Sequence, residues 1–186
     1  MANKIKYGLK NVYYAVATEG EGGVLSYATP VRIPGAVNLS MEAQGDTTPF
    51  YADNILYWQG IANNGYSGTL EIATVPDSFR TDVLGDAEDT NSVQYEMASA
   101  KGKEFALLFQ FEGDANAVRH CFYRCTASRA AVNGQTSEAS ITPQTETLNI
   151  TAMPRINDEL VKSRCDETTA ATQYAAWFNA VYEPTN

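Results

Sequence analysis

The sequence is poor in the residues from which metal and catalytic sites are usually built. Its 186 residues include one histidine, His120, and three cysteines. In the segment HCFYRC, strand alternation would place His120 on the face opposite Cys121 and Cys125, and no second pair of ligands follows at the spacing of a zinc site. We therefore expect no metal and no cofactor.

Disulfides and membrane-spanning segments are not expected either. Cys121 and Cys125 lie in one predicted strand, where their Cα atoms would be about 13 Å apart, too far for a disulfide. With Cys165 the number of cysteines is odd, which suits a reducing cytoplasm. No apolar run approaches the ~18 residues of a membrane span. The N-terminal VYYAVA is too short for a signal peptide, so we predict a strand there.

Basic residues are scarce in one third of the chain. Between Glu42 and Glu96 the sequence holds ten acidic residues and one basic residue, Arg80, whereas the remainder holds twelve of each. The net charge of -9 therefore arises within this segment. A protein that grips DNA needs the opposite sign, because Lys and Arg neutralise phosphates. A solvated acidic face that aids solubility is the simplest interpretation.

Two groups of carboxylates are the candidates for acid–base catalysis. They are Asp46 with Asp53, and Asp86 with Glu88 and Asp89. Their spacing does not show that either group converges on a substrate, and the second group is equally typical of a surface loop or a weak calcium ligand set. The segment NNGYSG lacks the lysine of a phosphate-binding loop. We do not expect an enzyme.

Most of the chain carries the patterns of β-strands. Val37, Leu39 and Met41 alternate with polar residues and should share the buried face of one strand. The turn signal ANNG predicts a hairpin between 55–61 and 66–75. Further strands are predicted by alternation and by β-forming residues over 12–17, 36–43, 105–111, 118–127 and 141–153, with 105–111 and 118–127 central and with a loop over 128–140.

Two segments carry helical patterns instead. The segment 76–85 begins with proline and stops at glycine, with Phe79 and Val83 four residues apart, which predicts a short helix on the sheet. The apolar face of a second, C-terminal helix, over about 168–182, would consist of Tyr174, Trp177, Phe178 and Val181. The expected fold is mainly β: an antiparallel β-sandwich or partly closed barrel with a short flanking helix and a C-terminal helix.

Five segments resemble, in the same order, those of the major tail proteins of long, non-contractile-tailed bacteriophages. They are YGLKNVYYAV, GDTTPFYADN, GYSGTLEIATVPDSFRTDVLG, TPQTETLNITAMPR and AAWFNAVYEP. The resemblance implies a single tail tube domain over 1–186, with an N-terminal arm (about 1–11), a long early loop (about 44–58) and the C-terminal helix. Because the sequence ends at VYEPTN, we expect none of the immunoglobulin-like domain that some relatives append.

The resemblance also implies a structural virion protein of a siphophage. Members of this family form hexameric rings that stack into a tail tube around the tape-measure protein, and their inner sheets join into a continuous lumen wall. A tail terminator and distal tail or baseplate proteins sit at the ends, and the genome passes through the lumen without specific binding. Such a protein is made and assembled in the host cytoplasm, resides in the virion tail and needs no membrane.

The early loop contains the apolar stretch FYADNILYW. In the family this loop reaches a neighbouring subunit or ring, so we expect Phe50, Tyr51, Tyr57 and Trp58 to be buried on assembly. Alternatively, Tyr57 and Trp58 face the core of their own subunit. The other expected interface residues are Asp46, Asp53 and Asn54 in the loop, and Lys4, Lys6 and Lys10 in the N-terminal arm, which would stay loose until it meets the acidic loop of the next ring.

Part of the acidic segment would line the lumen, where repulsion from phosphates lets DNA slide. The candidates are Glu42, Glu71 and Glu96. Two other functions compete with this interpretation. A carbohydrate-binding or adhesin-like β-sandwich would use an aromatic platform of Tyr51, Tyr57, Trp58 and Tyr66. The tube of a phage-derived, DNA-free particle, or of a contractile tail, would share the sequence features of the siphophage tube.

Overall fold

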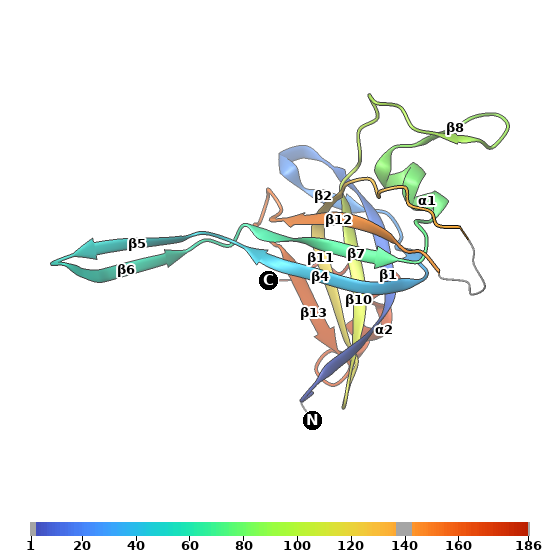
Figure 1. Cartoon of the computed structure of the whole chain (residues 1–186). Coiled ribbons are helices and arrows are strands. Elements are labelled where there is room, and N and C mark those ends of the chain that lie inside the picture. The colour runs from blue at the N-terminus through green and yellow to red at the C-terminus, as the bar shows by residue number, and fades with distance from the viewer. Residues whose placement is uncertain (1–2, 137–142, 186) are drawn as a thin grey trace.

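The computed structural model describes residues 3–136 and 143–185 and shows a mainly antiparallel β-fold (Figure 1). The largest sheet has the order β2-β1-β10-β11-β12-β7-β4, with β3 added to β1 and β13 added to β11. Its strands are β1 (Lys6–Glu19), β2 (Leu25–Tyr27), β3 (Val31–Ile33), β4 (Ala36–Gln44), β7 (Gly65–Ile72), β10 (Phe105–Gly113), β11 (Val118–Ala127), β12 (Glu146–Met153) and β13 (Lys162–Asp166).

The sheet folds over on itself into two layers, as in a β-sandwich. Strands β4, β7 and β12 form the front layer and run crosswise to β1, β10, β11 and β13 behind them (Figure 1). Strand β11 joins the layers, because its first half pairs with β13 and its second half pairs with β12. At the other edge β4 approaches β1 without pairing, so hydrogen bonds do not close the sheet into a barrel. The predicted β-sandwich class is confirmed.

Two hydrophobic cores lie on opposite faces of the back layer. The larger core fills the space between the layers around Tyr14, Leu70 and Phe105, all fully buried. The smaller core lies behind β1, β10 and β11 and is covered by the C-terminal segment, whose Trp177 is 1% exposed. Strands β10 and β11 contribute to both cores, which is why residues 105–109 of β10 and 121–123 of β11 are apolar without a break.

Short helices close the ends of the sandwich. Helix α1 (Asp77–Phe79) and the π-helical turn η2 (Arg80–Leu84) lie over the larger core and bury Phe79 and Val83, as the spacing of these two residues predicts. The turn ends at Gly85, whose φ of 85° suits glycine. A 3-10 turn, η1 (Glu21–Gly23), links β1 to β2, and a small hairpin of β8 (Ala87–Glu88) and β9 (Gln94–Tyr95) follows η2.

The C-terminal helix is shorter than the sequence predicts. Regular helix α2 covers only Ala171–Ala176, whereas about 168–182 was expected. At its start, the Asp166 carboxylate accepts hydrogen bonds from the backbone N–H groups of Thr168 and Thr169 and holds these residues in a turn. After it, Trp177 is buried in the smaller core and its indole N–H donates to the His120 carbonyl oxygen at 3.3 Å. These tertiary contacts replace further helical turns.

The N-terminal segment is strand rather than a loose arm. Lys6 and Leu9 pair with Gly113 and Phe111 of β10, so β1 begins well inside the predicted arm of about 1–11. The Asn3 side chain also bonds to the loop at Asn116, accepting from its N–H at 2.8 Å. Residues 1–2 lie outside the described part of the chain. The N-terminal segment is therefore ordered by the end of β10 in its own chain, whereas it was expected to become ordered only against another subunit.

Three strand predictions change in detail. Val37 is 54% exposed because β4 bulges between Ala36 and Asn38. Of the three residues predicted to share a buried face, only Leu39 and Met41 pack against the larger core. Irregular pairing of β10 with β11 likewise places Cys121 in the smaller core and Cys125 in the larger one, so the thiols do not share a face. The last predicted strand, 141–153, begins only at Glu146; 141–142 and part of the 128–140 loop lie outside the described residues.

Candidate assembly surfaces

Residues 44–58, expected to be a long loop, form most of a hairpin that projects far from the sandwich (Figure 1). Strand β5 (Thr47–Ala52) pairs with β6 (Ile55–Ile61), and these strands form a separate two-stranded sheet. The predicted pairing of 55–61 with 66–75 is therefore wrong. Strand β7 pairs with β4 and β12 instead.

Local turn chemistry builds this hairpin. Asp53 and Asn54 connect Ala52 to Ile55 and have φ angles of 51° and 63°, the left-handed conformation of a two-residue hairpin turn that Asn and Asp tolerate. At the base, the Ala62 N–H donates to the Asp46 carbonyl oxygen at 3.0 Å. The β5–β6 ladder therefore continues the β4–β7 ladder outward as one long ribbon.

The base of the hairpin is a narrow neck. A Cβ atom on Gly45 would lie 1.9 Å from the Ala62 carbonyl oxygen, so only glycine permits this approach of the two backbones. The Asn64 N–H donates to the Gln44 carbonyl oxygen at 2.8 Å on the body side of the neck. The turn signal ANNG thus lies where two strands pass each other, and not at the end of a hairpin.

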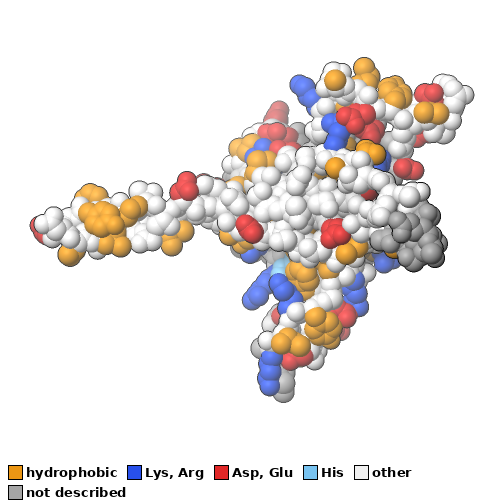
Figure 2. All heavy atoms as spheres, in the orientation of Figure 1, with side chains coloured by type: hydrophobic (Ala, Val, Ile, Leu, Met, Phe, Trp, Pro, Cys, Tyr) orange, Lys and Arg blue, Asp and Glu red, His pale blue; other side chains and the backbone are white. Residues whose placement is uncertain are grey.

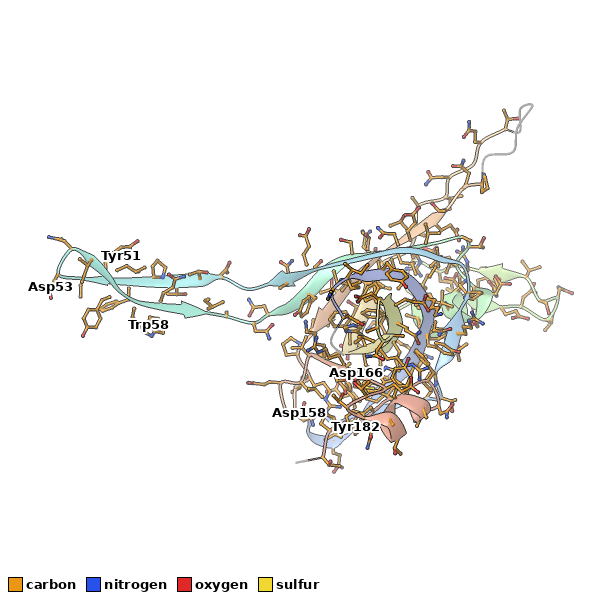
Figure 3. All side chains as sticks on the ribbon, turned by 90° about the horizontal axis from the view of Figure 1, so that it is seen from below. Tyr51, Asp53, Trp58, Asp158, Asp166 and Tyr182 are labelled. Carbon is orange, nitrogen blue, oxygen red and sulfur yellow. The ribbon has the colours of Figure 1, made fainter. Side chains whose placement is uncertain are left out.

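The projecting hairpin exposes apolar side chains on both of its faces. Phe50 is 55% exposed, Tyr51 65%, Tyr57 69% and Trp58 57%. Phe50 pairs with Trp58 on one face, while the next residue, Tyr51, pairs with Leu56 on the other (Figure 3). The main ring contact within the hairpin is an edge-to-face approach of Phe50 and Tyr57 at 6.5 Å.

None of these aromatic residues belongs to either core of the described structure. The alternative in which Tyr57 and Trp58 face their own core is therefore wrong. The aromatic platform of the competing carbohydrate-binding hypothesis does not form either. Tyr66 lies in the body against Phe122, with ring centroids 5.1 Å apart, and Tyr51 lies on the face of the hairpin opposite Trp58.

The exposed face of the front layer is polar and free of cations. Three aligned rows cross β4, β7 and β12, and every outward side chain in them is polar. The only charges are the carboxylates of Glu42 and Glu71, and the Thr145 hydroxyl donates to Glu71 at 2.7 Å. We call this surface the polar grid; its rows are Asn38, Glu71 and Thr147; Ser40, Thr69 and Asn149; and Glu42, Ser67 and Thr151. Figure 2 shows it as a largely white area with red and no blue side chains.

Two residues of the polar grid were predicted from the sequence, but the extent of this surface was not. The alternation of 36–43 and the many threonines of β12 were the available signals, but the register that aligns them across β7 is long-range. Glu96, the third expected lumen residue, does not belong to the grid. It forms an ion pair with Arg129 at 2.8 Å, beyond the β8–β9 hairpin.

The expected interface lysines lie far from the projecting hairpin, around the start of β1. Lys10 forms an ion pair with Glu112 of its own chain. Lys6 instead lies over the Phe111 ring, 4.5 Å from its centroid. Close by, His120 stacks on Phe109, and burial, followed by the charges of neighbouring cations, lowers its pKa to about 4.

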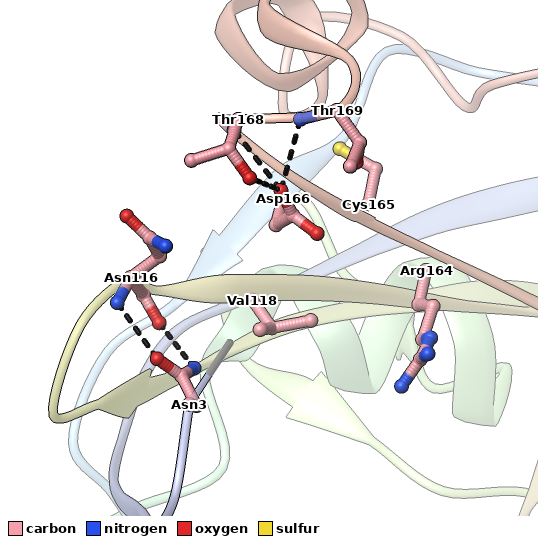
Figure 4. A pocket seen from close by; sticks show the side chains of 8 residues that line it. All are labelled: Asn3, Asn116, Val118, Arg164, Cys165, Asp166, Thr168 and Thr169. Carbon is pink, nitrogen blue, oxygen red and sulfur yellow. Dashed lines mark hydrogen bonds between the residues drawn. The ribbon is translucent and has the colours of Figure 1, made fainter. Parts of the chain in front are cut away.

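The described residues hold no grouping that favours catalysis or metal binding. No three His, Cys, Asp or Glu side chains gather at one point among them. A cavity of about 650 Å³ lies between Asn3, Arg164 and Asp166 (Figure 4). The hydrogen bonds from Thr168 and Thr169 lower the pKa of Asp166, and burial raises the pKa of the Cys165 thiol, which disfavours its thiolate form.

No helix within 3–136 or 143–185 is both long enough and apolar enough to cross a membrane. A β-sandwich whose projecting hairpin exposes apolar side chains is typical of a protein that buries this surface against a partner. The chain belongs to the phage tail tube protein family, whose model matches residues 37–181. The match includes the hairpin and all of the polar grid. No curated protein matches the chain by sequence.

Proposed function

We propose that this protein polymerises as stacked hexameric rings into the tail tube of a siphophage, and that the β5–β6 hairpin joins each subunit to a neighbour. The carrying observation is the exposure of Phe50, Tyr51, Tyr57 and Trp58 on both faces of an isolated two-stranded ribbon. Such a ribbon is at best marginally stable alone in water. Contact with a second subunit would remove its apolar surface from solvent, as in other protein interfaces.

The polar grid is proposed to line the lumen. A surface of hydroxyl, amide and carboxylate groups presents no Lys or Arg to which phosphates could bind. Glu42 and Glu71 add repulsion, so DNA would slide past this surface without specific binding. Glu96 is withdrawn from this role, because it is paired with Arg129 away from the grid.

The remaining partners are those that the resemblance to the major tail proteins implies. Before the genome passes, the lumen would hold the tape-measure protein, and the tail terminator and the distal tail or baseplate proteins would cap the two ends. The subunit would be made and assembled in the host cytoplasm and would reside in the virion tail. The tube of a DNA-free, tail-like particle remains the second candidate, and packaged DNA in the purified particles distinguishes the two.

Substitution of the hairpin aromatics tests the proposal. Phe50→Ser with Tyr51→Ser should leave a folded monomer that forms no tubes in negative-stain electron microscopy, because the substitutions remove apolar area used between subunits and none used in either core. The matched control, Phe50→Tyr with Tyr51→Phe, keeps the aromatic area and should still form tubes. Normal tubes from the double serine variant would refute the role of the hairpin.

A further inference from the structure

Three cations gather on the body of the protein without a carboxylate partner. They are Lys6 of β1 with Lys162 and Arg164 of β13, and together they are named the cation cluster. Lys6 lines one surface cavity with Arg164 and another with Lys162. Lys162 lies 4.3 Å from the centroid of the Tyr66 ring and donates to the Tyr66 hydroxyl. Throughout the described structure, no ion pair involves any of the three. All three side chains are exposed, so an acidic partner can reach them.

The nearby carboxylates are occupied elsewhere. Glu112 pairs with Lys10, and Asp114 accepts the backbone N–H of Lys4 at 2.8 Å. Asp166 accepts the N–H groups at the start of the turn before α2. The cation cluster is therefore a positive surface in a chain whose net charge is -9. Ile5 and Tyr7 beside it are 60% and 53% exposed, so the surface is also apolar.

A second surface carries the complementary pattern. Residues 86–97, which include β8 and β9, form an excursion from the sandwich that we name the acidic excursion. Arg129 pairs with Asp86 and Glu96 at its base, but Glu88 is exposed and forms no ion pair with any described residue. The Asp89 carboxylate accepts the backbone N–H of Asn91 at 2.7 Å and that of Val93 at 2.9 Å, which fixes the turn and leaves its negative charge at the tip.

The acidic excursion also exposes apolar side chains. Val93, Tyr95 and Met97 are 57%, 46% and 53% exposed. The excursion and the cation cluster therefore match in both charge and apolar character. They lie at opposite ends of the molecule: β8 is at the top of Figure 1, whereas the start of β1 and the end of β13 lie toward the bottom. They cannot meet within one chain.

We propose that the cation cluster of one subunit binds the acidic excursion of a second copy of this chain. Because the two surfaces differ, the contact is head-to-tail, and it repeats without limit unless it closes into a ring. It deepens the proposed tube function, on which it rests, by naming a second contact independent of the β5–β6 hairpin. Charge complementarity would also select the correct partner surface and speed the encounter.

Charge reversal tests the contact. One variant carries Lys6→Glu and Arg164→Glu, and the other carries Glu88→Lys and Thr90→Lys, which leaves the Asp89 turn intact. Each variant alone would place like charges in contact and should raise the critical concentration for polymerisation, measured by light scattering, about tenfold. An equimolar mixture should recover to within about twofold of the wild-type value, because each reversed surface then finds a complementary one.

The outcomes separate this contact from the proposed function. If the wild-type protein forms no tubes, the proposed function is wrong, whatever the variants do. If wild type forms tubes and both variants polymerise normally, or if the folded variants fail alone and the mixture does not recover, the contact between cluster and excursion is overturned. Near-ultraviolet circular dichroism establishes that each variant is folded. If a reversal variant does not fold, Lys6→Gln with Arg164→Gln replaces the first and Glu88→Gln the second, each with a smaller rise expected.

Discussion

His120 shows at the scale of one residue how the fold determines a protonation state. Burial is the largest cause of its lowered pKa, and the charges of Lys6, Arg164 and Lys162 add to it. Its ring stacks on the Phe109 ring, with the two centroids 5.2 Å apart, and thus packs at the edge of the larger core. Protonation of the imidazole in this buried place costs free energy, so the fold is more stable while His120 is neutral.

This environment predicts a pH-dependent stability. The unfolded chain takes up a proton on its histidine near pH 6.5, whereas the folded chain does so near pH 4. The contribution is therefore complete above pH 6.5 and is lost as the pH falls toward 4, and it amounts to about 2–3 kcal/mol of unfolding free energy. NMR titration of the single histidine should give a midpoint near 4.

His120→Gln provides the control for this prediction. Because glutamine does not titrate, urea unfolding of the variant should vary less between pH 6.5 and pH 4 than that of the wild type. A histidine midpoint near 6.5 in the folded protein would contradict the buried, cation-flanked environment.

Single residues also show where a local sequence pattern fails to predict burial. The alternation Val37, Leu39, Met41 predicted one buried face, but a bulge turns Val37 to solvent and brings Ala36 against the core. The bulge depends on pairing with β7, which lies far along the chain, so no local pattern could reveal it. By contrast, the spacing of Phe79 and Val83 correctly predicted burial, because one short helical segment carries both residues.

At the scale of elements, the hairpin pairing was the principal error. Two turn signals compete in this region, DN at residues 53–54 and NNG at 63–65. Local propensity permits a reversal at either one. The DN turn prevails because it lets β5–β6 continue the ladder of β4–β7, whereas NNG falls at the neck beside Gly45. Correct pairing therefore required the long-range register of the front layer.

The hairpin is predicted to be dispensable for folding. Replacing residues 47–61 by Asn-Gly should join the neck with a two-residue turn, because Asp46 and Ala62 already form a ladder hydrogen bond. Since no apolar residue of the hairpin belongs to either core of the described chain, the unfolding free energy in urea should change by less than about 1 kcal/mol. The shortened protein should form no tubes.

Two results would contradict that view of the hairpin. A shortened protein that does not fold would show that the ribbon stabilises the body. Tubes formed by the shortened protein would show that the ribbon is not an essential contact between subunits.

At the scale of the whole molecule, the acidic segment from Glu42 to Glu96 does not form one face. Its carboxylates are divided between the polar grid, the projecting hairpin, the α1–η2 segment and the acidic excursion. The sequence could show the charge imbalance but not this division, because strands close in sequence place side chains on different faces. The β-sandwich class and the central strands, in contrast, were predicted from alternation, β-forming residues and turn signals.

The most direct test of the central claim is a cryo-electron microscopy reconstruction of the purified wild-type protein at concentrations that promote polymerisation. We expect hollow tubes of uniform width built from hexameric rings, with Glu42 and Glu71 facing the lumen and Phe50 and Tyr51 buried against a neighbouring subunit. A protein that stays monomeric at every concentration, even with distal tail complexes added as nuclei, would contradict the claim. So would tubes in which the hairpin points into solvent and the polar grid faces outward.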